Sequence, residues 1–210
     1  MALELRWFFQ GPLPPEIAQW CRSGTLGGMK AERKLQNDIY CRQAGCPHIG
    51  LKLRDGEPKK RKLELKALMD ENPFSIERPS VKGMAQRWDK RSWKNPVYED
   101  RIMGQLTKAS NDSWIEVKKM RYQRFFKIGD ENEITSIKDN ENRDADFVLE
   151  LTKLTVQGTE WWTIAIDAYG NGRDEGEVMR MAVEYIFSHY PRSPPIMEES
   201  DSYPGWLAKL

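Results

Sequence analysis

Two short stretches decide the fold, Leu51-Lys52-Leu53-Arg54 and Lys62-Leu63-Glu64-Leu65-Lys66, because each alternates an aliphatic residue with a charged one. Successive side chains of a β-strand point to opposite faces of the sheet, so the aliphatic residues of each stretch share one face and the charged residues share the other. The segment between the stretches contains Asp55-Gly56 and Pro58, which are typical of a hairpin loop. The two stretches are therefore predicted to be neighbouring antiparallel strands with one apolar and one charged face.

The same alternation recurs in Leu3-Glu4-Leu5-Arg6, Leu149-Glu150-Leu151-Thr152 and Ile164-Ala165-Ile166-Asp167. Any one strand of this kind is also typical of a sheet whose charged face lies in solvent. The recurrence, together with the few helices available to cover a broad flat sheet, favours a barrel whose outer aliphatic face is covered by helices and whose lumen is lined with charge. The predicted fold class is α+β, mainly β: an eight-stranded antiparallel closed barrel, or tunnel, with short helices and a C-terminal helix.

Eight stretches are predicted to be strands from their alternation, their β-branched or aromatic content and their flanking turn residues: 2–9, 36–41, 50–55, 62–68, 114–126, 133–137, 146–156 and 161–169. Helices are predicted over 14–21, where proline suits the first turn, and over 177–189, which has an apolar face. The segment 71–105 contains several prolines and is expected to form short helices and loops. We expect one domain over 1–190 and a loosely held tail over 191–210, with docking of Trp206 and Leu207 as the alternative.

Composition argues against several classes of partner. Charged residues make up 31% of the 210 residues, yet the formal net charge is +1, so we expect neither specific nucleic-acid binding nor membrane binding. The one basic run, Lys59-Lys60-Arg61-Lys62, is typical of a solvated hairpin tip. No stretch approaches the roughly 18 apolar residues of a membrane span, and the first residues lack a signal-peptide layout. We therefore expect a cytoplasmic protein.

The cysteines favour the same compartment. Three cysteines at irregular spacing favour reduced thiols over a disulfide framework. Cys41, Cys46 and His48 are a weaker candidate for part of a zinc site, because a structural site needs four ligands and no fourth has motif spacing.

The charged strand motifs occur in a characteristic order. Glu4 and Arg6 come first, followed by Gly50-Leu51-Lys52-Leu53-Arg54, Lys62-Leu63-Glu64-Leu65-Lys66, Glu116-Val117-Lys118-Lys119-Met120-Arg121 and Asp167-Ala168-Tyr169-Gly170. Over residues 2–170 this order resembles the CYTH, or triphosphate tunnel, family. Members of that family have eight-stranded tunnels in which basic side chains hold a triphosphate and acidic ones hold one or two Mg²⁺ or Mn²⁺ ions. Many hydrolyse inorganic triphosphate, thiamine triphosphate or an RNA 5′ triphosphate, and a few are adenylate cyclases.

The resemblance implies a role for each charged residue of these strands. The phosphate-binding residues would be Arg6, Lys52, Arg54, Lys62, Lys66, Lys119 and Arg121, and the metal ligands would be Glu4, Glu64, Glu150 and Asp167. Converging cations are what a small polyphosphate ligand requires, and a few carboxylates leave Mg²⁺ or Mn²⁺ positions for substrate oxygens and water. In the strand 114–126, Lys119 and Arg121 share one face and Glu116 and Lys118 the other. The first pair reproduces the family's Lys-x-Arg spacing and is expected in the lumen.

The sequence departs from the family pattern at the metal ligands. The opening signature of the family is Glu-x-Glu-x-Lys, whereas the matching positions are Ala2, Glu4 and Arg6, so one carboxylate is missing. The family also shows paired glutamates near the eighth strand, whereas Asp167 has Ala165 and Tyr169 as its same-face neighbours. Binding of a triphosphate-containing molecule is therefore more strongly predicted than its hydrolysis.

Two non-catalytic alternatives stay open. One is a metal-poor phosphate-binding tunnel, and the other is a helix-grip fold with an apolar pocket. The direction of the basic side chains distinguishes them, because a tunnel has them inside and a helix-grip fold has them outside. These side chains are Lys52, Arg54, Lys62 and Lys66.

Overall fold

The structure, a computed structural model, describes residues 2–23, 26, 31–42, 46–55, 62–93, 114–138 and 144–210. Its strands are β1 (Leu3–Gln10), β2 (Glu32–Cys41), β3 (Ile49–Asp55), β4 (Lys62–Ile76), β5 (Val81–Trp93), β6 (Trp114–Ile128), β7 (Ile134–Ile137), β8 (Phe147–Val156) and β9 (Thr159–Ala168). Its helices are α1 (Pro15–Arg22), α3 (Glu175–Ser188), the short 3₁₀ helix η4 (Met197–Glu199) and α4 (Tyr203–Lys209). Most of the basic run predicted as a hairpin tip, residues 59–61, lies outside the described residues.

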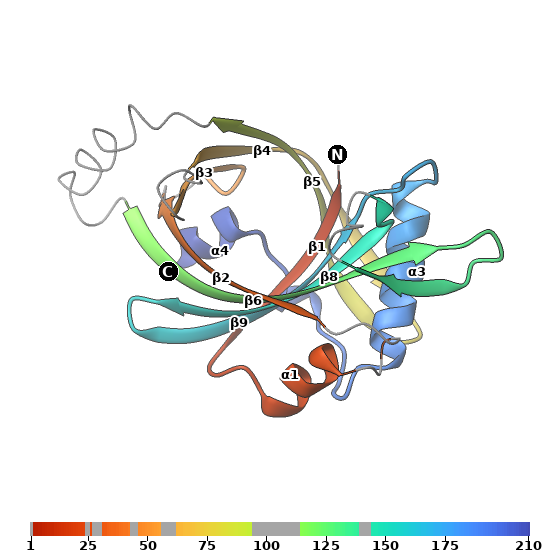
Figure 1. Ribbon diagram of the computed structural model, residues 1–210. Helices are drawn as coiled ribbons and strands as arrows, with labels where there is room; N and C mark the ends of the chain where they lie inside the picture. The colour runs from red at the N-terminus through yellow and green to blue at the C-terminus, as the bar shows by residue number, and fades with distance from the viewer. Residues whose placement is uncertain are drawn as a thin grey trace.

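Eight of the strands close into a barrel (Figure 1). They follow the order β2-β3-β4-β5-β1-β9-β8-β6, and antiparallel pairing of β6 with β2 completes the ring. The predicted closed antiparallel barrel is therefore confirmed. The predicted strand 133–137 is present as β7 but is not one of the eight strands of the ring. Its partner in the described part of the sheet is the far end of β6, outside the ring.

The remaining barrel strand is β5, which pairs with β4 on one side and β1 on the other. The expectation of short helices and loops was wrong for 71–93, where the end of β4 and all of β5 form a long hairpin, while 94–105 lies outside the described residues. Pro73 is accommodated inside β4 because pairing of β4 with β3 ends at Ala67, and proline is tolerated in such an edge segment.

The aliphatic faces of the strands form a core on the outside of the barrel wall. Helix α3 packs against β9, β8 and β1, and α1 adds Ile17 and Trp20 to the same core. Asp174 caps the start of α3 by accepting a hydrogen bond from the backbone N–H of Glu177 at 2.9 Å. The fully buried strand residues beneath the helices include Leu5, Trp7, Leu149, Leu151, Ile164 and Ile166. Because side chains alternate, this packing directs the charged residues of these strands into the lumen.

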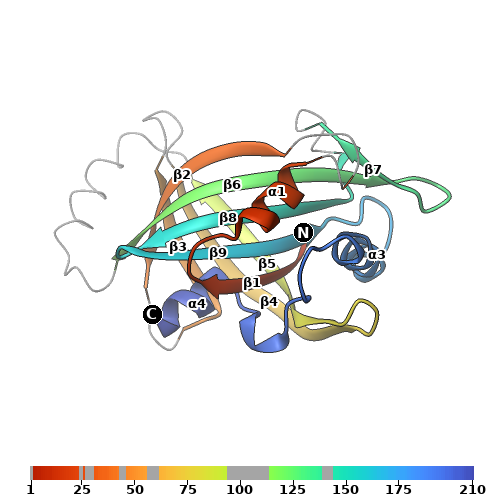
Figure 2. The ribbon, with the colours of Figure 1, turned by 90° about the horizontal axis from the view of Figure 1, so that it is seen from below.

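The C-terminal segment closes one end of the barrel. Helix α4 lies within the outline of the ring in Figure 1 and at one end of the molecule in Figure 2. Trp206 and Leu207 are buried, and the Trp206 ring stacks on Phe8 with 4.6 Å between centroids. The C-terminal segment is therefore docked onto the barrel, as the alternative expectation for Trp206 and Leu207 had it, and is not a loosely held tail.

Backbone and side-chain contacts fix this segment to three strands. The Ser200 hydroxyl donates to the carbonyl of Arg6 at 3.0 Å and accepts from the N–H of Met84 at 2.8 Å, which bridges β1 and β5. Gly50 of β3 leaves room for Pro204, because a Cβ at residue 50 would lie 2.6 Å from the proline ring. Among the described residues no helix has the length and apolar character needed to cross a membrane.

Candidate functional site

The barrel encloses a cavity of about 490 Å³ with a highly charged lining. Seven basic side chains line it, namely Arg6, Lys52, Arg54, Lys66, Lys90, Lys119 and Arg121. Five acidic side chains join them, namely Glu4, Glu64, Asp89, Glu150 and Asp167. Of the predicted site residues only Lys62 is not part of this lining, and its Nζ lies 3.3 Å from Glu64. The cations thus lie inside, as a tunnel requires and a helix-grip fold does not.

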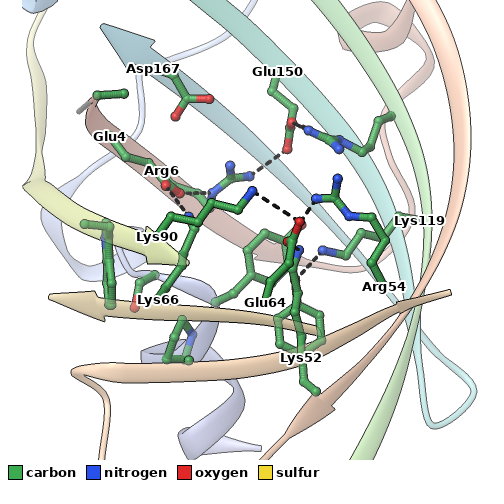
Figure 3. Close-up of a pocket in the computed structure, with 18 of the residues that line it drawn as sticks. Glu4, Arg6, Lys52, Arg54, Glu64, Lys66, Lys90, Lys119, Glu150 and Asp167 are labelled. Atoms are coloured by element: carbon green, nitrogen blue, oxygen red, sulfur yellow. Dashed lines mark hydrogen bonds and ion pairs between the residues drawn. The ribbon is translucent and has the colours of Figure 1, made fainter. Parts of the chain in front are cut away.

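Glu64 is the centre of the most basic part of the wall (Figure 3). Its side chain is 0% exposed, and its Oε2 lies 3.3 Å from Lys52 Nζ and 3.2 Å from Arg54 Nη2. Its Oε1 lies 3.3 Å from Lys62 Nζ and 3.4 Å from Lys90 Nζ. Burial opposes ionisation of Glu64, but the cations, led by Lys52 and Arg54, outweigh it and lower its pKa to about 2. We call these four cations the Glu64 quartet; with Asp38, which contacts Lys52, the described residues place two carboxylates among them, so positive charge is in excess.

Lys119 lies beneath the C-terminal segment. Its Nζ lies 3.1 Å from Asp38 Oδ2, donates to the hydroxyl of Tyr40 at 2.6 Å and lies 3.7 Å from the centre of the Tyr203 ring. Lys52 contacts the same Asp38 oxygen at 3.1 Å. Burial lowers the pKa of Lys119 well below its ordinary value, so an additional anion would favour its charged form.

The wall formed by β1, β6 and β8 is nearly neutral. Arg6 donates to Glu4 at 2.8 Å and to Glu150 at 3.1 Å, and Arg121 donates to Glu150 through Nε at 2.9 Å and also through Nη2. Lys66 donates to the second oxygen of Glu4 at 3.0 Å. Burial opposes ionisation of Glu4, but Lys66 and Arg6 lower its pKa to about 2. Glu4 and Glu150 each contact two cations, whereas Glu64 contacts the four cations of the quartet.

The acids predicted as metal ligands serve mainly as counter-ions. Glu4, Glu64 and Glu150 each contact two or more cations. Burial, reinforced by Glu4, raises the pKa of the remaining acid, Asp167, to about 7. In the described part of the chain no three metal-ligating side chains gather into a group that could hold an ion. This arrangement does not fit a Mg²⁺ or Mn²⁺ site, and the metal stays a prediction.

Strand phase was predictable for β6, whereas several other residues of the site were missed. Lys119 and Arg121 line the cavity, while Glu116 and Lys118 are 51% and 66% exposed on the outer face. The missed residues include Trp88, Lys90 and Tyr203 of the cavity lining, and Asp38, which contacts Lys52 and Lys119. Trp88 and Lys90 lie in Gln86-Arg87-Trp88-Asp89-Lys90, which is polar on both faces and so gives no alternation signal.

Three cavity-lining side chains carry buried donors that have no hydrogen-bond partner among the residues that the structure describes. These donors are Arg54 Nε, Trp88 Nε1 and the hydroxyl of Tyr203. Buried donors without acceptors are unfavourable, so they mark positions where a bound acceptor would stabilise the protein.

Comparison with known proteins shows the fold of this chain. No protein-family model matches the sequence, and no curated protein matches it. A conserved hypothetical protein from Pyrococcus furiosus is 13% identical and superposes with a TM-score of 0.54 over 97% of this chain and 98% of its own. The PH1012 protein from Pyrococcus horikoshii OT3 is 12% identical with a TM-score of 0.54, and the PH1819 protein is 13% identical with a TM-score of 0.51. Both alignments cover 100% of this chain and 99% of the other protein. At these identities the similarity shows a shared fold.

Proposed function

We propose that this chain is a divergent member of the CYTH, or triphosphate tunnel, family and that it binds the tri- or polyphosphate group of a small molecule inside the barrel. The observation that carries the proposal is the Glu64 quartet, in which Lys52, Arg54, Lys62 and Lys90 all lie within 3.4 Å of one carboxylate. A polyphosphate supplies several negative charges on a flexible chain, which suits cations that converge from three adjacent strands.

The charge distribution favours one side of the cavity for the phosphates. Arg6 and Arg121 are paired with Glu4 and Glu150, so an anion gains less from them than from the quartet. Arg54 also carries a buried Nε donor for which the described residues supply no acceptor. We therefore expect the phosphate chain to lie along β3, β4 and β5.

The proposal is binding without a hydrolytic step. Metal-assisted hydrolysis needs carboxylates that are available to the ion, whereas Glu4, Glu64 and Glu150 are engaged by cations and Ala2 replaces the first carboxylate of the family signature. The basic residues of the cavity are then left to bind and neutralise an anion.

The test is calorimetric titration with tripolyphosphate in the presence of EDTA, using the double variant Arg54→Ala, Lys90→Ala. Glu64 keeps Lys52 and Lys62 as partners in this variant, so we expect it to fold. Each lost charge-assisted contact should weaken binding by roughly 1.5 to 3 kcal/mol.

The matched control is Lys118→Ala, Lys127→Ala, which removes two exposed lysines of β6 that do not line the cavity. Its affinity should equal that of the wild type. Equal affinity in the wild type and the cavity variant would overturn the proposal. Phosphate release measured with added Mg²⁺ or Mn²⁺ is the second readout, and turnover that depends on the metal would show that binding is only part of the activity.

A further inference from the structure

The strand that closes the barrel carries a buried acid that lies behind the cavity wall. Asp38 of β2 is 0% exposed and is not part of the cavity lining. Its Oδ2 lies 3.1 Å from Nζ of Lys52 and 3.1 Å from Nζ of Lys119, and both lysines line the cavity. The two ammonium groups are thus no farther apart than twice that distance, although they come from β3 and β6, on opposite sides of β2. Asp38 therefore sets the spacing of two cations that face the ligand.

Hydrogen bonds fix the Asp38 carboxylate in turn. Gln36 donates to Oδ1, and the hydroxyl of Tyr40 donates to Oδ2 at 3.4 Å. Gln36 and Tyr40 lie two residues before and two residues after Asp38, so the three side chains share one face of β2. The Tyr40 hydroxyl also accepts from Lys119 at 2.6 Å. The orientation of the carboxylate, and with it the position of the lysines, is thus set by β2 itself.

Lys119 depends on Asp38 more than Lys52 does. Lys52 also lies 3.3 Å from Glu64, whereas Asp38 is the one acid within ion-pair distance of Lys119 in the described part of the chain. Burial is the largest influence on Lys119 and lowers its pKa, and the attraction of Asp38 is the largest effect that opposes burial. The titratable groups that face Lys119 from the surrounding elements are Asp38, Tyr40, Lys52, Arg121, Glu150 and Tyr203. The second acid among them, Glu150, is already engaged by two arginines.

We propose that Asp38 is a positioning residue for anion binding, which holds Lys52 and Lys119 side by side and charged so that both bind the same phosphate group. This inference rests on the proposed function and adds a residue that acts through the two lysines without touching the ligand. Its role is opposite to that of Glu64. Glu64 lines the cavity and competes with the ligand for cations, whereas Asp38 lies behind the lysines and supports them.

The test is calorimetric titration of Asp38→Asn with tripolyphosphate in the presence of EDTA. The substitution removes the charge of Asp38 with little change of shape. At about pH 8 the variant should bind about tenfold more weakly than the wild type, because the charge-assisted contact of Lys119 with the phosphate is lost. If Asp38 only neutralised positive charge, its removal would instead make the cavity more positive and tighten binding.

A pH series is the readout that a purely structural role would not change. Without Asp38, Lys119 must take up a proton on binding at about pH 8, whereas at about pH 5.5 it already carries that proton. The ratio of the wild-type affinity to the variant affinity should therefore fall toward one as the pH is lowered. Ionisation of tripolyphosphate is common to both proteins and cancels in this ratio.

Lys119→Met keeps the proposal testable if Asp38→Asn folds poorly. Asp38 retains Lys52 and Gln36 as partners in this variant, so we expect it to fold and to bind tripolyphosphate about tenfold more weakly. The double variant Asp38→Asn, Lys119→Met removes both charges of one pair, and its loss of affinity should be well short of the product of the two single losses. The matched control is Glu116→Gln, at a 51% exposed carboxylate on the outer face of β6, which should bind as the wild type does.

The outcomes separate this inference from the proposed function. Binding by Asp38→Asn at about pH 8 that is as tight as that of the wild type, or tighter, would show that Asp38 only neutralises charge, and the polyphosphate site would stand without it. An equal loss at every pH, or losses that multiply in the double variant, would also overturn the positioning role. If the wild type does not bind tripolyphosphate, the proposed function fails, and the role of Asp38 fails with it.

Discussion

Lys90 Nζ lies 3.4 Å from Glu64 Oε1, which joins β5 to β4 near the open end of their hairpin, in the charged wall of the cavity. Burial is the largest influence on this lysine and lowers its pKa; the attraction of Glu64 opposes that effect, and repulsion from Lys52 and Arg54 reinforces it. The resulting pKa is about 8, compared with an ordinary value of 10.5. Lys90 therefore titrates at a pH at which the protein is easily studied.

The first prediction is a loss of polyphosphate affinity as the pH rises through about 8. A bound anion favours charged Lys90, so the pKa of Lys90 is higher in the complex than in the free protein. Below the free-protein value both states carry the proton, and affinity does not depend on this group. Above it the free protein has lost the proton and must regain it on binding. Affinity should then fall by up to about tenfold per pH unit, with proton uptake measurable by calorimetry in buffers of different ionisation enthalpy.

Lys90→Arg separates this effect from titration of the ligand. Arginine stays charged throughout the range, so the variant should bind with little pH dependence beyond that of the phosphate groups. Identical pH profiles in the wild type and Lys90→Arg would show that Lys90 does not bind the anion.

The second prediction concerns Glu64→Gln. Removing the carboxylate leaves four cations without their shared counter-ion, so the variant should unfold more easily, by about 3 kcal/mol. The same change makes the wall more positive, and tripolyphosphate should bind roughly tenfold more tightly. Thermal unfolding with and without tripolyphosphate measures both effects, and the ligand should raise the melting temperature more in the variant than in the wild type.

Glu71→Gln is the matched control, because Glu71 lies in the same strand, is exposed and does not line the cavity. It should change neither stability nor affinity appreciably. A Glu64→Gln variant that binds tripolyphosphate more weakly than the wild type would indicate instead that Glu64 acts through a metal ion, as the family resemblance implied.

The third prediction is that Asp167→Asn stabilises the protein at neutral and higher pH. Burial, reinforced by Glu4, raises the pKa of Asp167 to about 7, so the folded state favours the protonated form. Below the unfolded-state pKa of about 4 the side chain is protonated in both states, and the variant should match the wild type. As the pH rises from about 4 to 7 the wild type loses stability relative to the variant, and above 7 the difference is constant.

Because Asp167 is only partly buried, we expect the free energy of unfolding of Asp167→Asn to exceed that of the wild type by about 1 to 2 kcal/mol at pH 8. This gain is smaller than the full pKa shift of Asp167 implies. Urea unfolding at about pH 4 and pH 8 measures it. Asp70→Asn, at a 55% exposed side chain, should show no such difference between the two pH values. A loss of stability in Asp167→Asn at pH 8 would mean that Asp167 is ionised and favourably paired.

The barrel could be predicted from sequence because its strands carry a strict alternation. Lys52 and Arg54 share one face of β3, and Leu51 and Leu53 share the other. This pattern predicts both the strand and which of its faces points into the lumen. The pattern fails in β5, where Arg87 on the outer face is as polar as Gln86 and Lys90 on the inner face. It also fails in the C-terminal segment, whose position depends on long-range contacts such as those of Ser200 with β1 and β5.

The candidate site divides in the same way. The site residues on the alternating strands could be predicted once those strands were predicted. Lys90 and Trp88 could not, because β5 was not predicted, and Tyr203 could not, because the position of helix α4 was not. Charge pairing was not predictable either, because it depends on side chains from different strands. The family resemblance predicted Glu64 to be a metal ligand, yet its neighbours in space are four cations.

The fourth prediction concerns the hydroxyl of Tyr203, which is buried in the cavity lining and has no hydrogen-bond partner within the described part of the chain. Burial raises the pKa of this phenol above its ordinary value, so it remains a protonated donor. Its ring lies 3.7 Å from Lys119 Nζ and stacks on Tyr40 with 5.5 Å between centroids. Tyr203→Phe keeps both ring contacts and removes a donor that contributes nothing in the free protein, so its melting temperature should equal or slightly exceed that of the wild type.

If the hydroxyl donates to a phosphate oxygen, Tyr203→Phe should bind tripolyphosphate about tenfold more weakly, which corresponds to roughly 1.4 kcal/mol. Tyr203→Leu should in addition lower the melting temperature, because it removes the stacking and the cation–π contact. Tyr40→Phe is the contrasting variant: the Tyr40 hydroxyl accepts from Lys119 at 2.6 Å, so its removal should destabilise the free protein. Unchanged affinity in a stable Tyr203→Phe protein would place the phosphates away from the closed end of the barrel and restrict them to the Glu64 quartet.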